Sequence, residues 1–482
     1  MDNSFLAHNL APVREERTVT ELAVTGTIPD HLDGRYVRNG PNPAADLDPE
    51  LYNWFMGDGM VHGVRLRDGR AEWYRNRWVR TPNLRSVLGE SAVAHRRHQA
   101  GFEFLGANTN VIGHAGRTLA LIEGGSAAVE LTDELDTVGP CDFNGTLAGG
   151  YTAHPIHDPA TGDLHAVSYS MGRGNTVQYS VIGADGRAKR TVDIQVGGSP
   201  MMHAFSLTEQ HVVFYDLPVT FYAKEAVEIS VPRPLRTPAR LILSAVVGRF
   251  RIPHPILARL DRTMRPNARM PYRWDPNYPA RIGVMPREGE HVRWLEVDPC
   301  YVFHPLNAYD DGDSIVLDIA RMPRTMDNDR HGPIEDSMPV LYRWTVDLKA
   351  GKVREECLDD RGQEFPRFDE RLTGRRHRYG YLIGATNIDR PVEALIKHDF
   401  AGNGSITREF GSGRSIGEFC FVPADGASAE DDGVLMGYVH NELQDSSDLV
   451  VLDAATLETT ATVHLPCRVP VGFHGNWLPV TA

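Results

Sequence analysis

The sequence predicts an all-β protein, and three observations support this prediction. Short runs rich in β-branched and aromatic residues fill nearly the whole length, as at 71–75, 118–122, 211–215, 314–318 and 449–452. Between such runs stand dipeptides that are typical of tight hairpin turns, namely Asp68-Gly69, Ala115-Gly116, Thr161-Gly162, Asp185-Gly186, Asp311-Gly312 and Asp432-Gly433. The 45 glycines and 32 prolines among 482 residues suit many short strands better than long helices.

Several units share a loose pattern in which a strand is followed by an Asp-x-x-Thr turn and a second strand. Residues 158–164 and 453–458 are two examples. Weak repetition at a period of tens of residues favours the blades of a β-propeller. A tryptophan-aspartate motif does not repeat along the sequence, so repetition alone does not give the number of blades.

One segment, residues 232–260, departs from this rhythm. It contains the apolar runs 241–243 and 245–247, framed by arginines at 233, 236, 240, 249 and 251. One interpretation is a buried helical insertion, because apolar helices with flanking arginines are common in protein cores. The other is an amphipathic surface that touches a membrane, which a membrane-dwelling substrate would favour.

Composition narrows the class of protein. Hydrophobic residues make up 41% and charged residues 24%, as in ordinary soluble proteins, and the net charge of −14 argues against nucleic acid as a partner. The five cysteines are far apart without a CxxC pair, which indicates free thiols in a reducing compartment. The N-terminus lacks a signal-peptide core, and no run of about 18 apolar residues occurs, so we expect a cytoplasmic protein with possible peripheral membrane contact.

Four of the twenty histidines stand out because each adjoins a predicted strand in an apolar, turn-rich context. They are His154, His203, His304 and His474. Their separations exclude a local HxxxH type of metal site, so only a closed ring fold could bring them to one axis. Taken singly, each is better explained as a hydrogen-bonded core histidine.

Six sequence blocks resemble those of the carotenoid cleavage oxygenase family, in order and from end to end. The blocks are Gly34–Pro43, Trp54–Gly63, Ala153–Pro155 with Asp158–Gly162, His203–Thr208 with Asp216–Pro218, Phe303–Tyr309, and Gly472–Trp477. The resemblance implies a seven-bladed propeller with a helical cap over the iron-bearing face. It also implies one domain over residues 1–482, with an apolar cap insertion around 219–275.

The same resemblance implies one non-haem Fe(II) per chain, held by His154, His203, His304 and His474, with O₂ as co-substrate. Glutamates that hydrogen-bond three of the imidazoles are matched by Glu123, Glu364 and Glu418. Such a carboxylate fixes the imidazole tautomer and turns the other nitrogen toward the metal. Three acids for four histidines leave one imidazole without a partner. The sequence does not decide which, and it matches none of the three glutamates to His474.

The expected reaction is oxidative cleavage of a conjugated double bond in a carotenoid or apocarotenoid, an apolar polyene, to aldehyde or ketone products. The alternative substrate is a lignostilbene-type stilbene, but stilbene-cleaving relatives carry a lysine where this chain has Ile122. A third hypothesis is a propeller that binds a lipid or a partner without turnover, and the presence of all four histidines argues against it. The oligomeric state is left open.

Candidate residues for an apolar substrate tunnel are mainly aromatic, and each could equally be a plain core residue. Thr109 is included because the resemblance places it beside the iron. The candidates are Thr109, Ile122, Phe303, Phe221, Trp54 and Phe473, together with Phe55, Tyr222 and Trp477.

Overall fold

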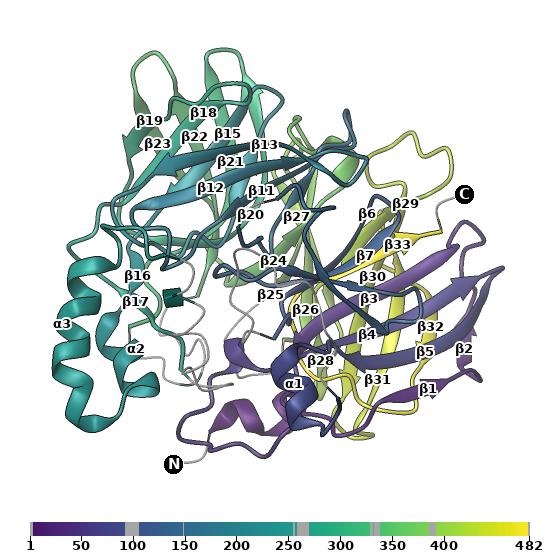
Figure 1. The fold of residues 1–482 in the computed structure, drawn as a ribbon. Helices are drawn as coiled ribbons and strands as arrows, with labels where there is room; N and C mark the ends of the chain where they lie inside the picture. Colours follow the sequence, from purple (N-terminus) through teal and green to yellow (C-terminus); the bar gives the residue numbers. More distant parts are fainter. Residues whose placement is uncertain are drawn as a thin grey trace.

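Strands dominate the computed structural model, which describes residues 3–91, 106–147, 149–253, 256–257, 269–327, 331, 338–384 and 392–480. The strands form seven sheets arranged around a common axis, together with one two-stranded ribbon (Figure 1). The predicted all-β class and the seven-bladed propeller are therefore confirmed.

The seven sheets follow one another around the ring largely in chain order, and each is antiparallel. The sheet that joins the two ends of the chain contains, in spatial order, β1 (Arg17–Val19), β5 (Arg70–Trp78), β4 (Gly59–Arg67), β3 (Gly34–Pro41) and β33 (Gly475–Pro479). Five four-stranded sheets follow: β6 (Asn110–His114), β7 (Arg117–Leu121), β8 (Ala128–Leu131) and β9 (Thr137–Cys141); β10 (Ile156–His157), β11 (Leu164–Ser168), β12 (Thr176–Ile182) and β13 (Ala188–Gln195); β14 (Phe205–Leu207), β15 (His211–Asp216), β18 (Arg281–Pro286) and β19 (Arg293–Glu296); β20 (Tyr301–Asp311), β21 (Ser314–Met322), β22 (Val340–Asp347) and β23 (Lys352–Asp359); and β24 (Gln363–Arg367), β25 (Tyr379–Gly384), β26 (Ala394–Asp399) and β27 (Gly404–Glu409). The last sheet contains β2 (Ala23–Gly26), β32 (Thr459–His464), β31 (Ser446–Asp453), β30 (Gly433–Asn441) and β28 (Arg414–Ile416), with β29 (Cys420–Pro423) also paired to β30.

Burial changes across each blade in the way that the sequence pattern requires. The middle strand β12 is buried along most of its length, because other blades cover both of its faces. In the outer strand β13, Val192 and Ile194 are buried while Lys189 and Asp193 are more exposed, which is the alternation of a half-solvated strand. The core therefore lies between the blades.

The predicted turn glycines behave as expected at most positions. Gly69, Gly116, Gly162, Gly186 and Gly312 all have a positive φ, which glycine adopts without steric cost. The turn expected at Asp432-Gly433 is wrong, because Gly433 begins β30. A Cβ there would lie 2.3–3.0 Å from atoms of Val422 and Phe421 in β29, so this glycine permits a close strand approach instead.

Both ends of the chain close the ring. The last strand, β33, pairs with β3 through the register Arg38↔Gly475 to Gly34↔Pro479. The early strand β2 adds to the blade formed by β28–β32, pairing with β32. The N- and C-terminal segments are thus tied into neighbouring blades, and the C-terminal residues cannot fray without opening the ring.

The helices gather on one side of the propeller, at the bottom of Figure 1. Outside the blades lie α1 (Pro82–Val87) and the 3₁₀ turns η1 (Ser4–Leu6), η2 (His8–Leu10), η3 (Trp54–Met56) and η5 (Glu370–Leu372). Between β15 and β18 the chain inserts β16 (Val219–Phe221), α2 (Ala223–Ser230), η4 (Arg233–Leu235), α3 (Arg236–Val246) and β17 (Tyr272–Trp274), with β16 paired to β17.

Of the two interpretations of residues 232–260, that of a buried helix is wrong. No residue of α3 is buried, and Leu241 and Ile242 are 64% and 63% exposed. Residues 254–255 and 258–260 of this segment lie outside the described residues. Within the described part of the chain, no helix has both the length and the apolar character needed to cross a bilayer.

Candidate metal centre

The four predicted histidines all lie at the innermost strand of a blade. His154 and His203 stand just before β10 and β14, His304 is the fourth residue of β20, and His474 directly precedes β33. Innermost strands meet at the propeller axis, so residues hundreds of positions apart in sequence converge there.

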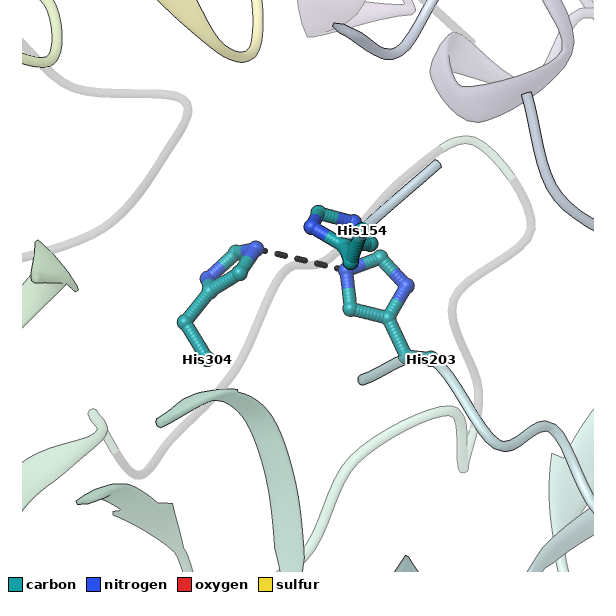
Figure 2. Close-up of side chains that lie close together, drawn as sticks. All are labelled: His154, His203 and His304. Carbon is teal, nitrogen blue, oxygen red and sulfur yellow. Dashed lines mark hydrogen bonds between the residues drawn. The ribbon is translucent and has the colours of Figure 1, made fainter. Parts of the chain in front are cut away.

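The imidazole rings form a compact cluster. Ring centroids lie 4.1 Å apart for His154–His203, 5.1 Å for His203–His304, 4.7 Å for His154–His474 and 4.8 Å for His304–His474. Figure 2 shows three of the rings, with Nε2 of His203 3.3 Å from Nε2 of His304. Donor nitrogens of His154, His203 and His304 all lie within 4.8 Å of one another.

Three of the four imidazoles are hydrogen-bonded to buried or half-buried glutamates through Nδ1. His203 donates to both oxygens of Glu123 at 3.0 Å, and His304 donates to Glu364 at 2.7 Å. His474 donates to Glu418 at 3.1 Å. A carboxylate only accepts, so each of these Nδ1 atoms carries a hydrogen, and in the neutral imidazole each Nε2 keeps a lone pair that can bind a metal.

Among the described residues, no glutamate is hydrogen-bonded to the ring of His154. Its Nε2 is buried and makes no hydrogen bond. The sequence had matched no acid to His474, but the structure places Glu418 beside it, because the β28–β29 connection adjoins the start of β33.

Each blade contributes one residue to this arrangement. Four blades supply the histidines, and the other three supply Glu123 after β7, Glu364 in β24 and Glu418 between β28 and β29. The seven residues therefore depend on the closure of the whole ring rather than on any local motif.

The donor set fits a metal cation. Nitrogens bound at about 2.1 Å to one ion lie about 3.0 to 4.2 Å apart, close to the separations found here. Two lone pairs that face each other at 3.3 Å repel unless a cation lies between them. The unpaired Nε2 of His154 gives a third donor without another partner.

Electrostatics differ between the imidazoles, because the carboxylates favour positive charge at His304 while burial disfavours it at His154. Burial lowers the pKa of His304, but the carboxylates of Glu364, Glu418 and Glu123 outweigh it and raise that pKa above its ordinary value. Burial and the neighbouring histidines hold the pKa of His154 well below its ordinary value. Burial would raise the pKa of Glu418, but Arg367 and His474 lower it to about 2, so this carboxylate is ionised.

Aromatic side chains cover one side of the cluster. Phe303 meets His203 edge to face at 5.1 Å, and Phe55 stacks on Phe473 at 5.8 Å and on Phe303 at 6.4 Å. Trp54 packs on Phe473 at 4.5 Å. Four predicted tunnel residues thus lie together beside the histidines, and such surfaces suit an apolar, conjugated ligand.

The other tunnel candidates lie in different surroundings. Thr109 is beside the centre, since its carbonyl accepts the backbone N–H of His474 at 3.2 Å. Ile122 packs in a separate, mainly aliphatic core that also contains Trp73. Phe221 lies in β16 against Tyr272, and Tyr222 precedes α2 under Arg273. Trp477 lies on β33 away from the aromatic cluster, so the structure does not group it with Phe303.

A cavity of about 960 Å³, lined by both polar and apolar residues, approaches the cluster from a direction that the aromatic cluster does not line. Its lining includes His154, His304, His474, Asn476 and Arg367.

Sequence reasoning missed Arg367, and it also missed Phe365, whose ring lies 5.2 Å from those of His304 and His474. Tyr169, hydrogen-bonded to Glu123, is a third such residue. The EFPR sequence at 364–367 was the one available signal, since it follows the matched glutamate directly.

The fold and the site together define a β-propeller protein with a polyhistidine centre on its axis. The sequence model of the retinal pigment epithelial membrane protein family matches residues 10–479. The chain belongs to this family, which includes the carotenoid cleavage oxygenases, and the predicted membership is confirmed.

Individual relatives agree with this membership. A carotenoid cleavage oxygenase of Mycobacterium tuberculosis is 57% identical over 99% of this chain and 98% of its own length. Carotenoid 9,10(9',10')-cleavage dioxygenase 1 of Arabidopsis thaliana is 32% identical over 98% of this chain and 89% of its own. A variant of the Synechocystis apocarotenoid oxygenase superposes with a TM-score of 0.78 at 26% identity, covering 97% of each chain. The Pseudomonas brassicacearum lignostilbene dioxygenase gives 0.77 at 27%, covering 99% and 98%.

Proposed function

We propose that this protein is an Fe(II)-dependent dioxygenase that cleaves a conjugated C=C bond of a carotenoid or apocarotenoid. One O₂ adds its two atoms across the bond, giving two aldehyde or ketone products. The observation that carries the proposal is the clustering of the rings of His154, His203, His304 and His474 beside an aromatic surface, with donor nitrogens of the first three within 4.8 Å of one another.

The chain's own residues have distinct roles in this proposal. The four imidazoles would hold one iron per chain, which when bound would supply the redox chemistry with O₂. Glu123, Glu364 and Glu418 keep three imidazoles in the tautomer whose Nε2 can bind a metal. Neutral imidazoles leave the ion its full charge.

The aromatic cluster would bind the polyene. Phe55, Phe303 and Phe473 present ring faces and edges in mutual contact, and they carry no group that could hydrogen-bond a polar substrate. The cluster would also keep water away from the reacting bond. The second candidate, a stilbene, is represented among solved structures by the lignostilbene dioxygenase. It is less favoured, because Ile122 sits in a mainly aliphatic core and offers no charged donor for a phenol.

We further propose that the insertion around 219–275 belongs to the single propeller domain and touches a membrane through α3. Leu235, Leu241, Ile242 and Phe250 are exposed apolar side chains, and arginines flank them along the same segment. An amphipathic helix of this kind lies in a bilayer interface and would let an apolar substrate pass directly into the protein.

The deciding experiment is an aerobic incubation of iron-loaded protein with an apocarotenal and, separately, with a hydroxystilbene, reading carbonyl products by mass. We expect apocarotenal products, about one iron per chain, and loss of both iron and activity in His304→Ala. Products from the hydroxystilbene alone would overturn the substrate assignment. Carbonyl products formed by iron-free protein would overturn the assignment of iron as the cofactor.

A further inference from the structure

The inner strand β24 contains an irregularity at the centre. Its ladder with β25 pairs Glu364 with Ile383 and Arg367 with Tyr381, so the register shifts between these two residues. Phe365, inside the shift, has φ = +51°. A regular strand points neighbouring side chains to opposite faces, whereas a bulge re-aims them. Here the bulge directs both Glu364 and Phe365 toward the histidines.

Phe365 touches the centre in two ways. Its ring is nearly parallel to the His304 ring, at 5.2 Å and 27°, and lies 5.2 Å from the His474 ring at 53°. Its backbone N–H donates to Oε2 of Glu364, the oxygen that also accepts from His304. A bulky residue with positive φ is strained, and such strain persists where the surroundings require it.

Arg367 reaches the same histidine pair from the other end of the bulge. Its guanidinium lies 3.5 Å from Oε1 of Glu418, donates to the Gly475 carbonyl at 3.3 Å and to Asn476 at 2.9 Å. Glu418 in turn accepts from His474 and from the backbone N–H of Gly475 at 2.7 Å. Arg367 thus holds both the carboxylate and the backbone that carry His474.

We propose that the bulge Glu364–Arg367 is the positioning element of the metal centre. Phe365 packs against the His304 and His474 rings and fixes the angle between them. Arg367 fixes the carboxylate that orients His474. Neither residue touches substrate in this role. The inference rests on the proposed function only in taking the four histidines as metal ligands.

Cobalt(II) binding to the purified, metal-free chain tests the inference independently of turnover. The visible absorption of bound Co(II) reports the geometry of its donors. Phe365→Leu keeps an apolar side chain without the flat ring, and Arg367→Met keeps the stem without the charge. We expect each to weaken Co(II) binding about 10- to 100-fold and to shift its absorption bands. Arg367→Lys should recover part of the affinity.

Matched controls separate positioning from general loss of stability. Phe214→Leu removes a fully buried ring from β15, and Arg343→Met removes the partner of the fully buried Asp318. Both should destabilise the fold while keeping the parent affinity and spectrum. If they weaken Co(II) as much as the bulge variants do, or if Phe365→Leu keeps the parent spectrum, the inference is overturned.

Two further outcomes complete the test. At a positive φ, glycine is favoured over alanine, so Phe365→Gly should resist urea better than Phe365→Ala, the reverse of the usual order in a strand. The opposite order would contradict the backbone strain assigned to Phe365. A parent protein that binds neither Co(II) nor Fe(II) would overturn the proposed metal centre itself, whereas a metal-binding parent with unaffected bulge variants would overturn only this inference.

Discussion

Acid should destabilise this protein through a buried histidine remote from the ligand set, His377. Its Nδ1 faces the side-chain Nδ2 of Asn307 at 3.3 Å. The orientation of that amide is fixed, because Nδ2 donates to the carbonyls of Leu372 and Arg375 and Oδ1 accepts from Gly374. Nδ1 of His377 must therefore accept a hydrogen bond. Protonation would set two donors against each other in a buried site.

The magnitude follows from the pKa. Burial lowers the pKa of His377 from 6.5 to about 4, outweighing the opposing effect of Asp318. Between these values the unfolded chain binds more protons than the folded one, so the free energy of unfolding falls as the pH falls through this window. From pH 7 to pH 5 this one group costs about 2 kcal/mol.

Urea unfolding of metal-free protein at pH 7 and pH 5 measures this loss. His377→Gln keeps an acceptor for Asn307 and a donor toward Asp318 but does not titrate. The difference in unfolding free energy between the two pH values should therefore shrink by about 2 kcal/mol in the variant. His8→Asn, which changes an exposed histidine, should leave that difference as in the parent. If His377→Gln keeps the parent's full acid sensitivity, the buried histidine is not its source.

Three other predictions concern the centre and the surface. Removing the last ten residues, 473–482, should abolish iron binding and lower the melting temperature, because β33 and His474 are lost together; a trimmed chain that retains iron by metal analysis would contradict this. Glu364→Gln should weaken Fe(II) binding about 10- to 100-fold in a chelator competition, since an amide orients His304 less strongly than a carboxylate; parent-like affinity would count against that role. Leu241→Glu with Ile242→Glu should reduce sedimentation with anionic lipid vesicles at least several-fold, with Leu443→Glu as an exposed control; equal binding of all three proteins would argue against the α3 contact.

Sequence patterns predicted the strands and turns well because these depend on local alternation and on glycine. They also singled out His154, His203, His304 and His474, but the prediction that these four act together at a metal rested on the ordered family blocks. The sequence could not predict which glutamate bonds to which histidine, because this depends on which blades lie side by side. Glu418 reaches His474 only after the ring has closed, and this leaves His154 without a partner.

Two other features escaped prediction for physical reasons. The role of Phe365 depends on a single backbone dihedral angle, which a Glu-Phe-Pro-Arg string does not specify. The surface position of α3 depends on what packs against it. Its composition suits a buried helix as well as an interfacial one, so the sequence left both possibilities open.

The seam between β3 and β33 has a consequence for how the protein would respond to metal supply. His474 directly precedes the strand that closes the ring, so an ion held by the four histidines would bind only the closed form. Mass action would then stabilise the closed ring by about 2.7 kcal/mol when free metal stands at 100 times its dissociation constant. Iron scarcity would show first as faster amide hydrogen exchange along Arg38↔Gly475 to Gly34↔Pro479, before any blade unfolds. Bound metal would thus hold the C-terminal strand β33 in its pairing with β3.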